Sequence, residues 1–220
     1  MKTAEKQRRP LNTKEVKTLQ KIRSTAEKDF KRGYKIHYLL TAAVVGVICA
    51  FLASETSYAF LTLVFGTASV LSFSMVIFMP YETYKDRRKA KKKINKIDAL
   101  LGQDGIDVVP VRATRIAVAK EFEDEGDLYI VETANKDILY LWDSDYNLKK
   151  NFPCLEFEIY SEDFYNLIGR QVNPLSEKYK PIIIDAKTKW TYLKKVGGPE
   201  HLAVEKRVFE EVIEEINNVA

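Results

Sequence analysis

The sequence has little of the chemistry on which most enzymes and metal proteins depend. It contains 2 histidines, 2 cysteines and 9 glycines in 220 residues. The patterns GxGxxG, GxxxxGK(S/T), GxSxG and HExxH are all missing, which excludes the common nucleotide-binding loops, the hydrolase nucleophile turn and the helical zinc site. Cys49 lies in an apolar stretch and Cys154 in the acidic half, so no disulfide is expected. We therefore predict no catalytic residue, no metal site and no cofactor.

Charge is nearly absent from one segment. Over residues 36–81 the only formally charged side chain is Glu55, although 30% of the sequence is charged. As a helix, Ile36 to Ser54 is about 28 Å long, close to a hydrocarbon core of about 30 Å. Thr56 to Tyr81 is long enough to cross back, either tilted or ending early at Pro80. We predict two transmembrane helices joined by a turn that holds Glu55, because a carboxylate is unfavourable at mid-bilayer.

Two other interpretations of this apolar segment are a secretory signal peptide and a buried hairpin of a soluble protein. Signal peptides begin near the N-terminus, whereas 35 residues precede this segment. Two uninterrupted runs of this length are rare in soluble proteins. Twelve Lys and Arg precede the first run, none lies in the turn and eight follow within Lys85 to Lys96. We therefore expect a bacterial inner (plasma) membrane protein with both termini cytoplasmic, whose basic flanks meet anionic headgroups.

Small residues line one predicted face of the hairpin. Ala42, Gly46 and Ala50 recur every four residues and permit close approach of another helix. Gly66 on the second run is expected to face them. The contact is either packing within the hairpin or an interface between protomers. Neither run contains Asp, Lys or Arg, and the single carboxylate belongs to the turn, so a two-span transporter is disfavoured.

Amphipathic helices are predicted on both sides of the hairpin. Apolar residues recur there every three or four positions: Val16, Leu19, Ile22, Ala26 and Phe30 before it, and Ala90, Ile94, Ile97 and Leu101 after it. The two stripes pack as an antiparallel stalk or lie on the membrane surface. Gly102 to Gly105 predicts a helix stop and a linker. The expected divisions are a basic N-terminal segment (1–35), the hairpin (36–81), a basic stalk and linker (82–104) and a β-rich domain (105–220).

From Ile106 onward the apolar period changes from about 3.6 to 2, which is typical of strands. The pattern predicts about six strands, within residues 116–122, 128–133, 138–142, 155–159, 167–172 and 181–185, with 190–193 as a further candidate. A C-terminal helix follows Pro199 and covers the sheet. The predicted fold class is a membrane α-helical hairpin plus an α+β cytoplasmic domain, with an antiparallel β-meander or partial barrel.

Charge is divided unevenly between the two halves. Residues 1–105 hold 20 Lys and Arg against 9 Asp and Glu, a net +11, whereas residues 106–220 hold 15 against 22, a net −7. Binding to a phosphate backbone requires clustered cations, and the β-rich half is acidic. Nucleic acid is therefore an unexpected partner.

Aromatic residues suggest one ligand pocket in the β-rich domain. Tyr129, Tyr140 and Trp142 fall on neighbouring predicted strands, with Arg170 as a candidate partner for an anionic ligand. Arg112 and Arg115 are alternatives to Arg170. Ordinary strand propensity explains the same aromatic residues without a ligand.

Paired carboxylates are the other chemical possibility. Glu121 with Glu123, and Glu156 with Glu158, are predicted to share strand faces and so could act as acid and base. A divalent cation site around Glu123, Asp124, Glu125 and Asp127 is a further alternative. His37 is interpreted as interfacial, His201 as a helix-capping residue and Cys154 as a packing residue.

Three runs between Glu121 and Tyr160, EFEDEGDLYIV, ILYLWDSDY and FPCLEFEIY, resemble a bacterial domain family of unknown function that pairs an EDEG turn with an FPC-x-EF strand. The resemblance covers about 40 residues and implies one domain beginning near residue 105, with no activity or catalytic residue. The layout is also similar to two-span membrane effectors of nucleotide-signalling phage-defence systems that carry a cytoplasmic β-rich domain.

These observations lead to three hypotheses. The first is a non-enzymatic two-pass membrane protein whose β-rich domain binds a protein partner as an adaptor or assembly subunit. The second is a sensor-effector that binds a small molecule and forms homo-oligomers through its hairpin. The third is an enzyme that uses the paired carboxylates.

Overall fold

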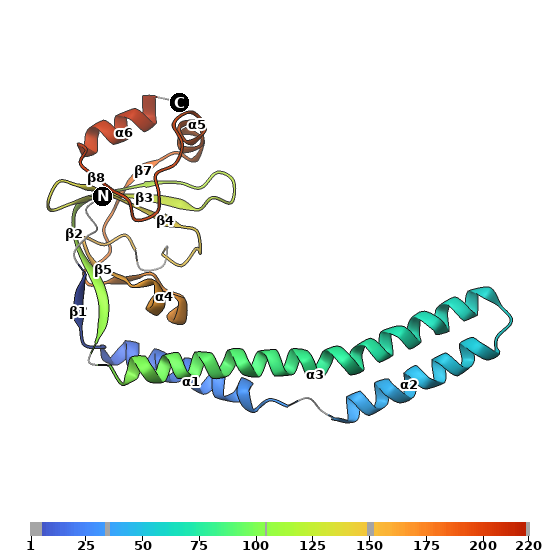
Figure 1. Ribbon diagram of the computed structural model, residues 1–220. Coiled ribbons are helices and arrows are strands. Elements are labelled where there is room, and N and C mark those ends of the chain that lie inside the picture. The colour runs from blue at the N-terminus through green and yellow to red at the C-terminus, as the bar shows by residue number, and fades with distance from the viewer. Residues whose placement is uncertain (1–5, 34–35, 104, 149–151, 219–220) are drawn as a thin grey trace. The chain divides into compact units, whose positions relative to one another are not determined.

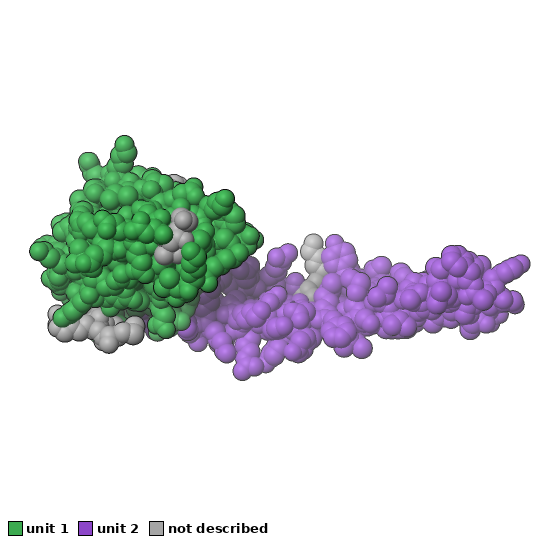
Figure 2. Space-filling view, turned by 90° about the horizontal axis from the view of Figure 1, so that it is seen from above, with its two compact units in different colours: residues 1–13, 103–220 green, residues 14–102 purple. Residues whose placement is uncertain are grey.

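The computed structural model describes residues 6–33, 36–103, 105–148 and 152–218. The chain divides into two compact units (Figure 2), which we call the β-unit (residues 1–13 and 103–220) and the helical unit (residues 14–102). Its described part contains six helices and eight strands (Figure 1). Lys2 and Lys35, counted above among the basic flanks, lie outside the described residues.

The apolar segment forms two long helices. Helix α2 (Ile36–Glu55) ends at the single charged residue, residues 56–58 make the turn, and α3 (Ala59–Leu101) returns. By length and composition, both helices are able to cross a membrane. Pro80 does not end α3, which continues without a break for 43 residues. Proline removes one backbone hydrogen bond, and the same turn gains one from the Thr83 hydroxyl to the Met79 carbonyl at 2.9 Å.

Helix α1 (Thr13–Lys31) is amphipathic and runs antiparallel to the end of α3. Arg23 pairs with Asp98 at 2.6 Å. Further along, Arg87 Nε donates to the Arg32 carbonyl at 3.3 Å. The apolar side chains Leu19 of α1 and Ile97 of α3 are completely buried, as the three-to-four residue spacing predicts.

The β-unit contains a largely antiparallel sheet. Its strands are β1 (Gln7–Arg9), β2 (Ile106–Ala119), β3 (Asp127–Thr133), β4 (Ile138–Asp143), β5 (Glu156–Tyr160), β6 (Val172–Pro174), β7 (Ile182–Ile184) and β8 (Val204–Glu205). Their order is β6-β5-β2-β3-β4-β8, with β1 and β7 also paired to β2, and only β7 pairs in parallel. The antiparallel sheet of the prediction is confirmed, with eight strands rather than about six.

Strand β2 joins two halves of this sheet. Residues 108–112 pair with β5, whereas residues 113–119 pair with β3, and the register shifts between Ala113 and Arg115. One face packs Ile116, Tyr129 and Phe157 into a core. The other face is covered by α5 (Ala186–Val196) and α6 (Phe209–Asn218), which add Tyr192 and Phe209 to a second core. Figure 1 shows these two helices on the same side of the sheet. The predicted covering of the sheet by a C-terminal helix is confirmed.

Three local predictions are wrong. Half of residues 167–172 belong to α4 (Glu162–Ile168) and its cap, because Gly169 adopts a left-handed conformation that ends a helix. Residues 190–193 lie inside α5, since Asp185 caps that helix by accepting hydrogen bonds from the N–H groups of Lys187 and Thr188. The last helix begins at Phe209 rather than after Pro199, because residues 204–205 form β8 beside β4.

Candidate functional site

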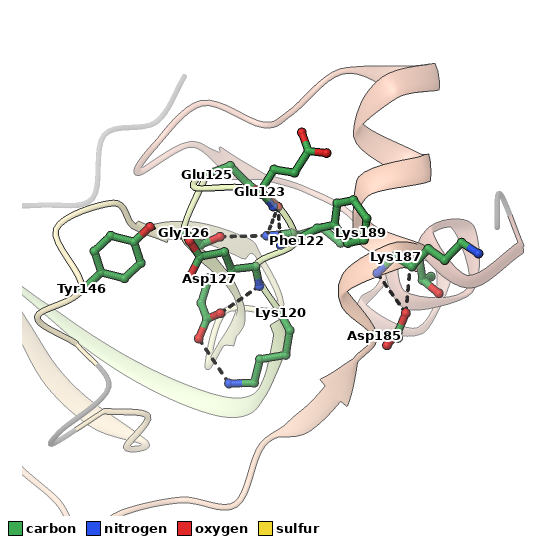
Figure 3. A network of polar contacts seen from close by, with 12 residues as sticks. Lys120, Phe122, Glu123, Glu125, Gly126, Asp127, Tyr146, Asp185, Lys187 and Lys189 are labelled. Atoms are coloured by element: carbon green, nitrogen blue, oxygen red, sulfur yellow. Dashed lines mark hydrogen bonds and ion pairs between the residues drawn. The ribbon is translucent and has the colours of Figure 1, made fainter.

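One buried lysine organises the acidic turn of residues 121–126. Lys189 of α5 is completely buried, and its Nζ donates to the Gly126 carbonyl at 2.8 Å and pairs with Glu125 Oε1 at 2.9 Å. The same ammonium lies 5.5 Å from the centroid of the Trp142 ring. Figure 3 shows Lys189 pointing into the turn. A buried cation requires such partners, so Lys189 and the turn depend on one another.

Glu125 folds the turn around its own carboxylate. Its two oxygens accept the backbone N–H groups of Phe122 at 3.0 Å and Glu123 at 2.6 Å. Burial alone would raise the pKa of Glu125, but the hydrogen bonds from Lys189 and from these N–H groups lower it to about 2. The carboxylate is therefore ionised across the physiological range and serves as a structural acceptor.

Two buried aspartates face each other across β3 and β4 at the same end of the sheet. Asp127 pairs in register with Asp143, and both are at most 2% exposed. Asp127 accepts the Glu121 N–H at 3.0 Å and pairs with Lys120 at 3.2 Å. Asp143 Oδ1 caps the following turn, while its Oδ2 is buried without a hydrogen-bond partner in the described structure. Burial, together with the charges of Asp143 and Asp127, raises the pKa of Tyr129.

The predicted pair Glu121 and Glu123 does not share a strand face, because β2 ends at Ala119 and both residues lie in the turn. Glu121 accepts a hydrogen bond from the Tyr146 hydroxyl at 2.5 Å, and this bond, with a smaller effect of burial, raises the pKa of Tyr146 to about 12. The carboxylates of Glu125 and Asp127 already bind groups within the turn. Among the described residues, no cluster of three or more His, Cys, Asp or Glu side chains is arranged to hold a metal ion.

The second predicted pair, Glu156 and Glu158, has one buried member. Glu158 accepts two hydrogen bonds from Arg9 of β1, at 2.7 and 2.5 Å, and a third from Asn173 at 3.0 Å. The side chain of Glu156 is 54% exposed and lies 3.7 Å from Arg112. Glu158 therefore fastens the N-terminal strand to the sheet.

The four residues of the predicted pocket do not gather in one place. Tyr129 belongs to the core on one face of the sheet. Tyr140 belongs to the core on the opposite face, where Trp142 packs against it from the edge. Arg170 Nε donates to the Val172 carbonyl at 3.1 Å. Since adjacent residues of a strand point to opposite faces, a register of one residue between Tyr129 and Tyr140 across β3 and β4 separates them.

The other arginines proposed as anion partners differ in their surroundings. Arg115 binds Glu132 at 2.7 Å, also pairs with Glu210, and its guanidinium lies 4.6 Å from the Phe209 ring centroid. The side chain of Arg112 is 81% exposed beside Glu156. Arg115 therefore connects α6 to the sheet.

His201 and Cys154 both have structural partners. His201 lies in a turn rather than at a helix start, and its Nδ1 accepts the Trp142 N–H at 3.1 Å while Gln171 contacts Nε2. Burial lowers the pKa of His201. Cys154 is completely buried in the core beside Phe157, and burial raises the pKa of its thiol. The thiol is therefore poorly suited to nucleophilic chemistry.

In the hairpin, Gly46 lies at a close contact between α2 and α3. It is buried, its carbonyl accepts a hydrogen bond from Ser69 at 3.0 Å, and a Cβ there would lie 3.2 Å from Ser72. Ala42 is half-buried, but Ala50 is exposed. Gly66 has open space where a Cβ would stand, beside a hollow of about 520 Å³. The hollow is lined by Ser57, Ala59, Thr62, Leu63, Gly66 and Thr67. Of the four predicted packing residues, Gly46 alone lies at a buried contact between α2 and α3.

Sequence reasoning missed Lys189, the residue on which the acidic turn depends. The signal that was available is Asp185, which has the spacing of a helix cap and predicts that Lys189 and Tyr192 share one helix face. The three apolar residues that precede Asp185 and the aromatic residues that follow it favoured a strand instead.

Comparisons with family models, with curated proteins and with solved structures give no match to this chain.

Proposed function

We propose that this chain is a two-pass bacterial inner-membrane protein, with both termini cytoplasmic, whose β-unit binds a protein partner as an adaptor or assembly subunit. The observation that carries the membrane part is the exposure of α2 and of the first half of α3. Only 6% of the most apolar 18-residue stretch of each helix is buried. Leaving that much apolar surface in water is unfavourable by about 25 cal/mol per Å².

This exposure bears on the two alternatives. A core hairpin of a soluble protein would be mostly buried, whereas Ile48 is 51% exposed and Ile77 is 70% exposed. A signal peptide would be a single short apolar segment, whereas two long apolar helices are present. The excess of Lys and Arg on both flanks favours a cytoplasmic location for both ends.

Exposed apolar side chains of the β-unit support a protein-binding role. Ile182 and Ile183 of β7 are 46% and 58% exposed, and Phe122 is 47% exposed and stacks on Trp190 with ring centroids 6.0 Å apart. We call these four residues the exposed apolar group; Ile182 and Ile183 are consecutive on β7 and so point to opposite sides of that strand. Exposed aromatic and aliphatic side chains of this kind are typical of protein interfaces.

The test combines membrane extraction with partner capture. Full-length protein in native membranes should resist alkaline carbonate, and gentle solubilisation should recover a second polypeptide in a fixed ratio. Ile183→Asp should reduce recovery of that polypeptide, whereas Leu175→Asp, at a residue that is 55% exposed and outside the exposed apolar group, should not. Release by carbonate would contradict the membrane anchor, and recovery of the chain alone would contradict the adaptor.

A homo-oligomeric sensor-effector is the second candidate, favoured by the open space at Gly66. Gly46 already packs within the hairpin, so the free small-residue surface is that of α3. Gly66→Leu should then abolish oligomers while leaving the hairpin intact, as small residues permit close approach of helices in lipid. Cross-linking in native membranes measures this, and oligomers that persist in Gly66→Leu would exclude the interface.

A further inference from the structure

The contact between α2 and α3 shows which residues of the two helices lie at the same level along the hairpin. Ser69 of α3 binds the Gly46 carbonyl, and Ser72 is the nearest neighbour of Gly46. Counting residues in opposite directions from this contact puts Ile36, the start of α2, level with about Tyr81 of α3. The hydrocarbon-spanning part of the hairpin therefore ends near Tyr81 if the chain crosses a bilayer as proposed above.

Exposed tyrosines gather at this depth. Tyr38 of α2 is 54% exposed, and Tyr81 and Tyr84 of α3 are 59% and 64% exposed. By the same counting they span about 7.5 Å along the helix axis, at about 1.5 Å per residue. Tyrosines concentrated at one depth are typical of the interface between membrane and water. This second observation agrees with the position of the charged residues, which begin at Glu82 on α3.

Cations follow immediately beyond the tyrosines. The hydrogen bond from Arg87 to the Arg32 carbonyl brings the end of α1 to the same level as this part of α3. This level of the helical unit holds two carboxylates, Glu82 and Asp86, and six cationic residues. The six are Lys31, Arg32, Lys85, Arg87, Arg88 and Lys89. All six except the half-buried Arg87 are exposed. We call these six residues the basic collar.

Depth separates the basic collar from the remaining lysines of the stalk. Because α3 is unbroken at Pro80, Lys85 to Lys89 lie about 6 to 12 Å beyond Tyr81, whereas Lys92 and Lys93 lie about 16 to 18 Å beyond it. The headgroup region is about 5 to 8 Å thick on each side, and charges are screened over about 8 Å. Among the described residues, the basic collar therefore lies within electrostatic reach of lipid phosphates, Lys91 at about 15 Å lies at the limit of that reach, and Lys92 and Lys93 lie beyond it.

We propose that the basic collar binds anionic phospholipid headgroups and gives the protein a preference for anionic lipid around its hairpin. This inference rests on the proposed membrane insertion and assigns the contact with anionic headgroups, expected above of the basic flanks as a whole, to six residues at one depth. Each Lys or Arg near an anionic surface adds to the attraction, and the collar carries a net excess of four cations over carboxylates.

The test compares two variants of the full chain that lose the same charge at different depths. The collar variant is K31Q/K85Q/R88Q/K89Q, which leaves Arg32 and Arg87 against Glu82 and Asp86. The distal variant is K17Q/K21Q/K92Q/K93Q. Glutamine has nearly the helix propensity of lysine, so both variants should fold. Each protein is purified in mild detergent with equimolar phosphatidylglycerol and phosphatidylethanolamine, and native mass spectrometry counts the retained lipids.

The wild-type protein and the distal variant should retain phosphatidylglycerol over phosphatidylethanolamine by about tenfold or more, and the collar variant should show no preference. Equal preference in all three proteins, equal loss in both variants, or retained nucleic acid in place of lipid would overturn the proposal. Carbonate extraction of the wild-type protein distinguishes a failure of the proposed membrane insertion from a failure of the proposed lipid binding. Release from the membrane contradicts insertion itself, whereas a protein that stays inserted without lipid preference contradicts only the basic collar.

Discussion

The two units use the same apolar residue types in opposite ways. In the β-unit, Ile130 and Phe157 are completely buried against other parts of the chain. In the helical unit, Phe60 is 74% exposed and Ile77 is 70% exposed. The β-unit therefore supplies its own apolar environment, whereas most apolar side chains of the hairpin are not covered by other described parts of the chain. This difference shows that hydrophobic composition alone does not distinguish a buried core from an exposed apolar surface.

Charged side chains are also distributed differently between the two units. The β-unit buries Lys189, Asp127 and Glu158, and each has a hydrogen-bonded partner of opposite charge. The hairpin contains one charged residue, Glu55, placed at the end of α2. A folded core tolerates ions that are paired, whereas lipid favours their exclusion. The following predictions test this contrast, from the largest expected effect to the smallest.

Lys189→Met should destabilise the β-unit by about 3 to 5 kcal/mol, because it leaves Glu125 and the Gly126 carbonyl without their buried partner. Both tryptophans of the chain, Trp142 and Trp190, belong to the β-unit, so denaturant unfolding followed by tryptophan fluorescence reports this unit alone. The matched control is the exposed Lys187→Met on the same helix, which should change stability by less than about 0.5 kcal/mol. Equal stability of the two variants would show that Lys189 does not hold the turn.

Arg9→Met should destabilise the β-unit by about 2 kcal/mol, since it leaves the buried Glu158 with only Asn173 as a side-chain donor. The effect is smaller than for Lys189 because the Arg9 side chain is 22% exposed. Arg8→Met, at the exposed neighbouring position, is the control. Hydrogen exchange of β1 and β5 measures the change, and unchanged protection in Arg9→Met would contradict the role of the ion pair.

Gly46→Leu should weaken the hairpin by about 1 to 3 kcal/mol, because the added side chain meets Ser72 and Phe73 at 3.2 and 3.3 Å. Fluorescence unfolding of the β-unit should stay unchanged. Cys49 is half-buried on α2 whereas Cys154 is completely buried, so the rate of maleimide labelling at Cys49 reports opening of the hairpin. In the Gly66→Leu variant, Cys49 should be labelled at the wild-type rate. Faster labelling in Gly66→Leu than in Gly46→Leu would show that Gly66, and not Gly46, lies on the packed face of the hairpin.

His201 should contribute the smallest effect, and one that depends on pH. Burial lowers its pKa in the folded state below the ordinary value of 6.5, so its contribution to stability is complete above that pH and is lost as the pH falls through the folded pKa. Protonation would also place a hydrogen on Nδ1, which accepts the Trp142 N–H. His201→Asn keeps an acceptor without titrating, so its unfolding midpoint should vary less than that of the wild-type protein between about pH 5 and 7. Identical profiles would exclude this role.

Local sequence patterns were sufficient to predict helices and strands whose conformation depends on residues close together in the sequence. The three-to-four residue spacing predicted α1, and the uncharged run predicted α2 and the start of α3. Alternation predicted β5, and apolar runs between turns predicted the end of β2, β3 and β4. Contacts between distant residues were not predictable in this way. Lys189 and Glu125 are 64 positions apart, and Arg9 and Glu158 are 149 apart, so no local period indicates that they meet.

By itself, the sequence determined where apolar surface is continuous, where charge is concentrated and that the chain changes from helix to strand between Leu101 and Ile106, because these depend on side-chain spacing along one element. Only the tertiary structure decided that Tyr129 and Tyr140 lie on opposite faces of the sheet, that the acidic turn encloses a lysine, and that Gly46 packs while Gly66 faces open space. The physical reason is that strand register and helix rotation are fixed by packing against distant parts of the chain.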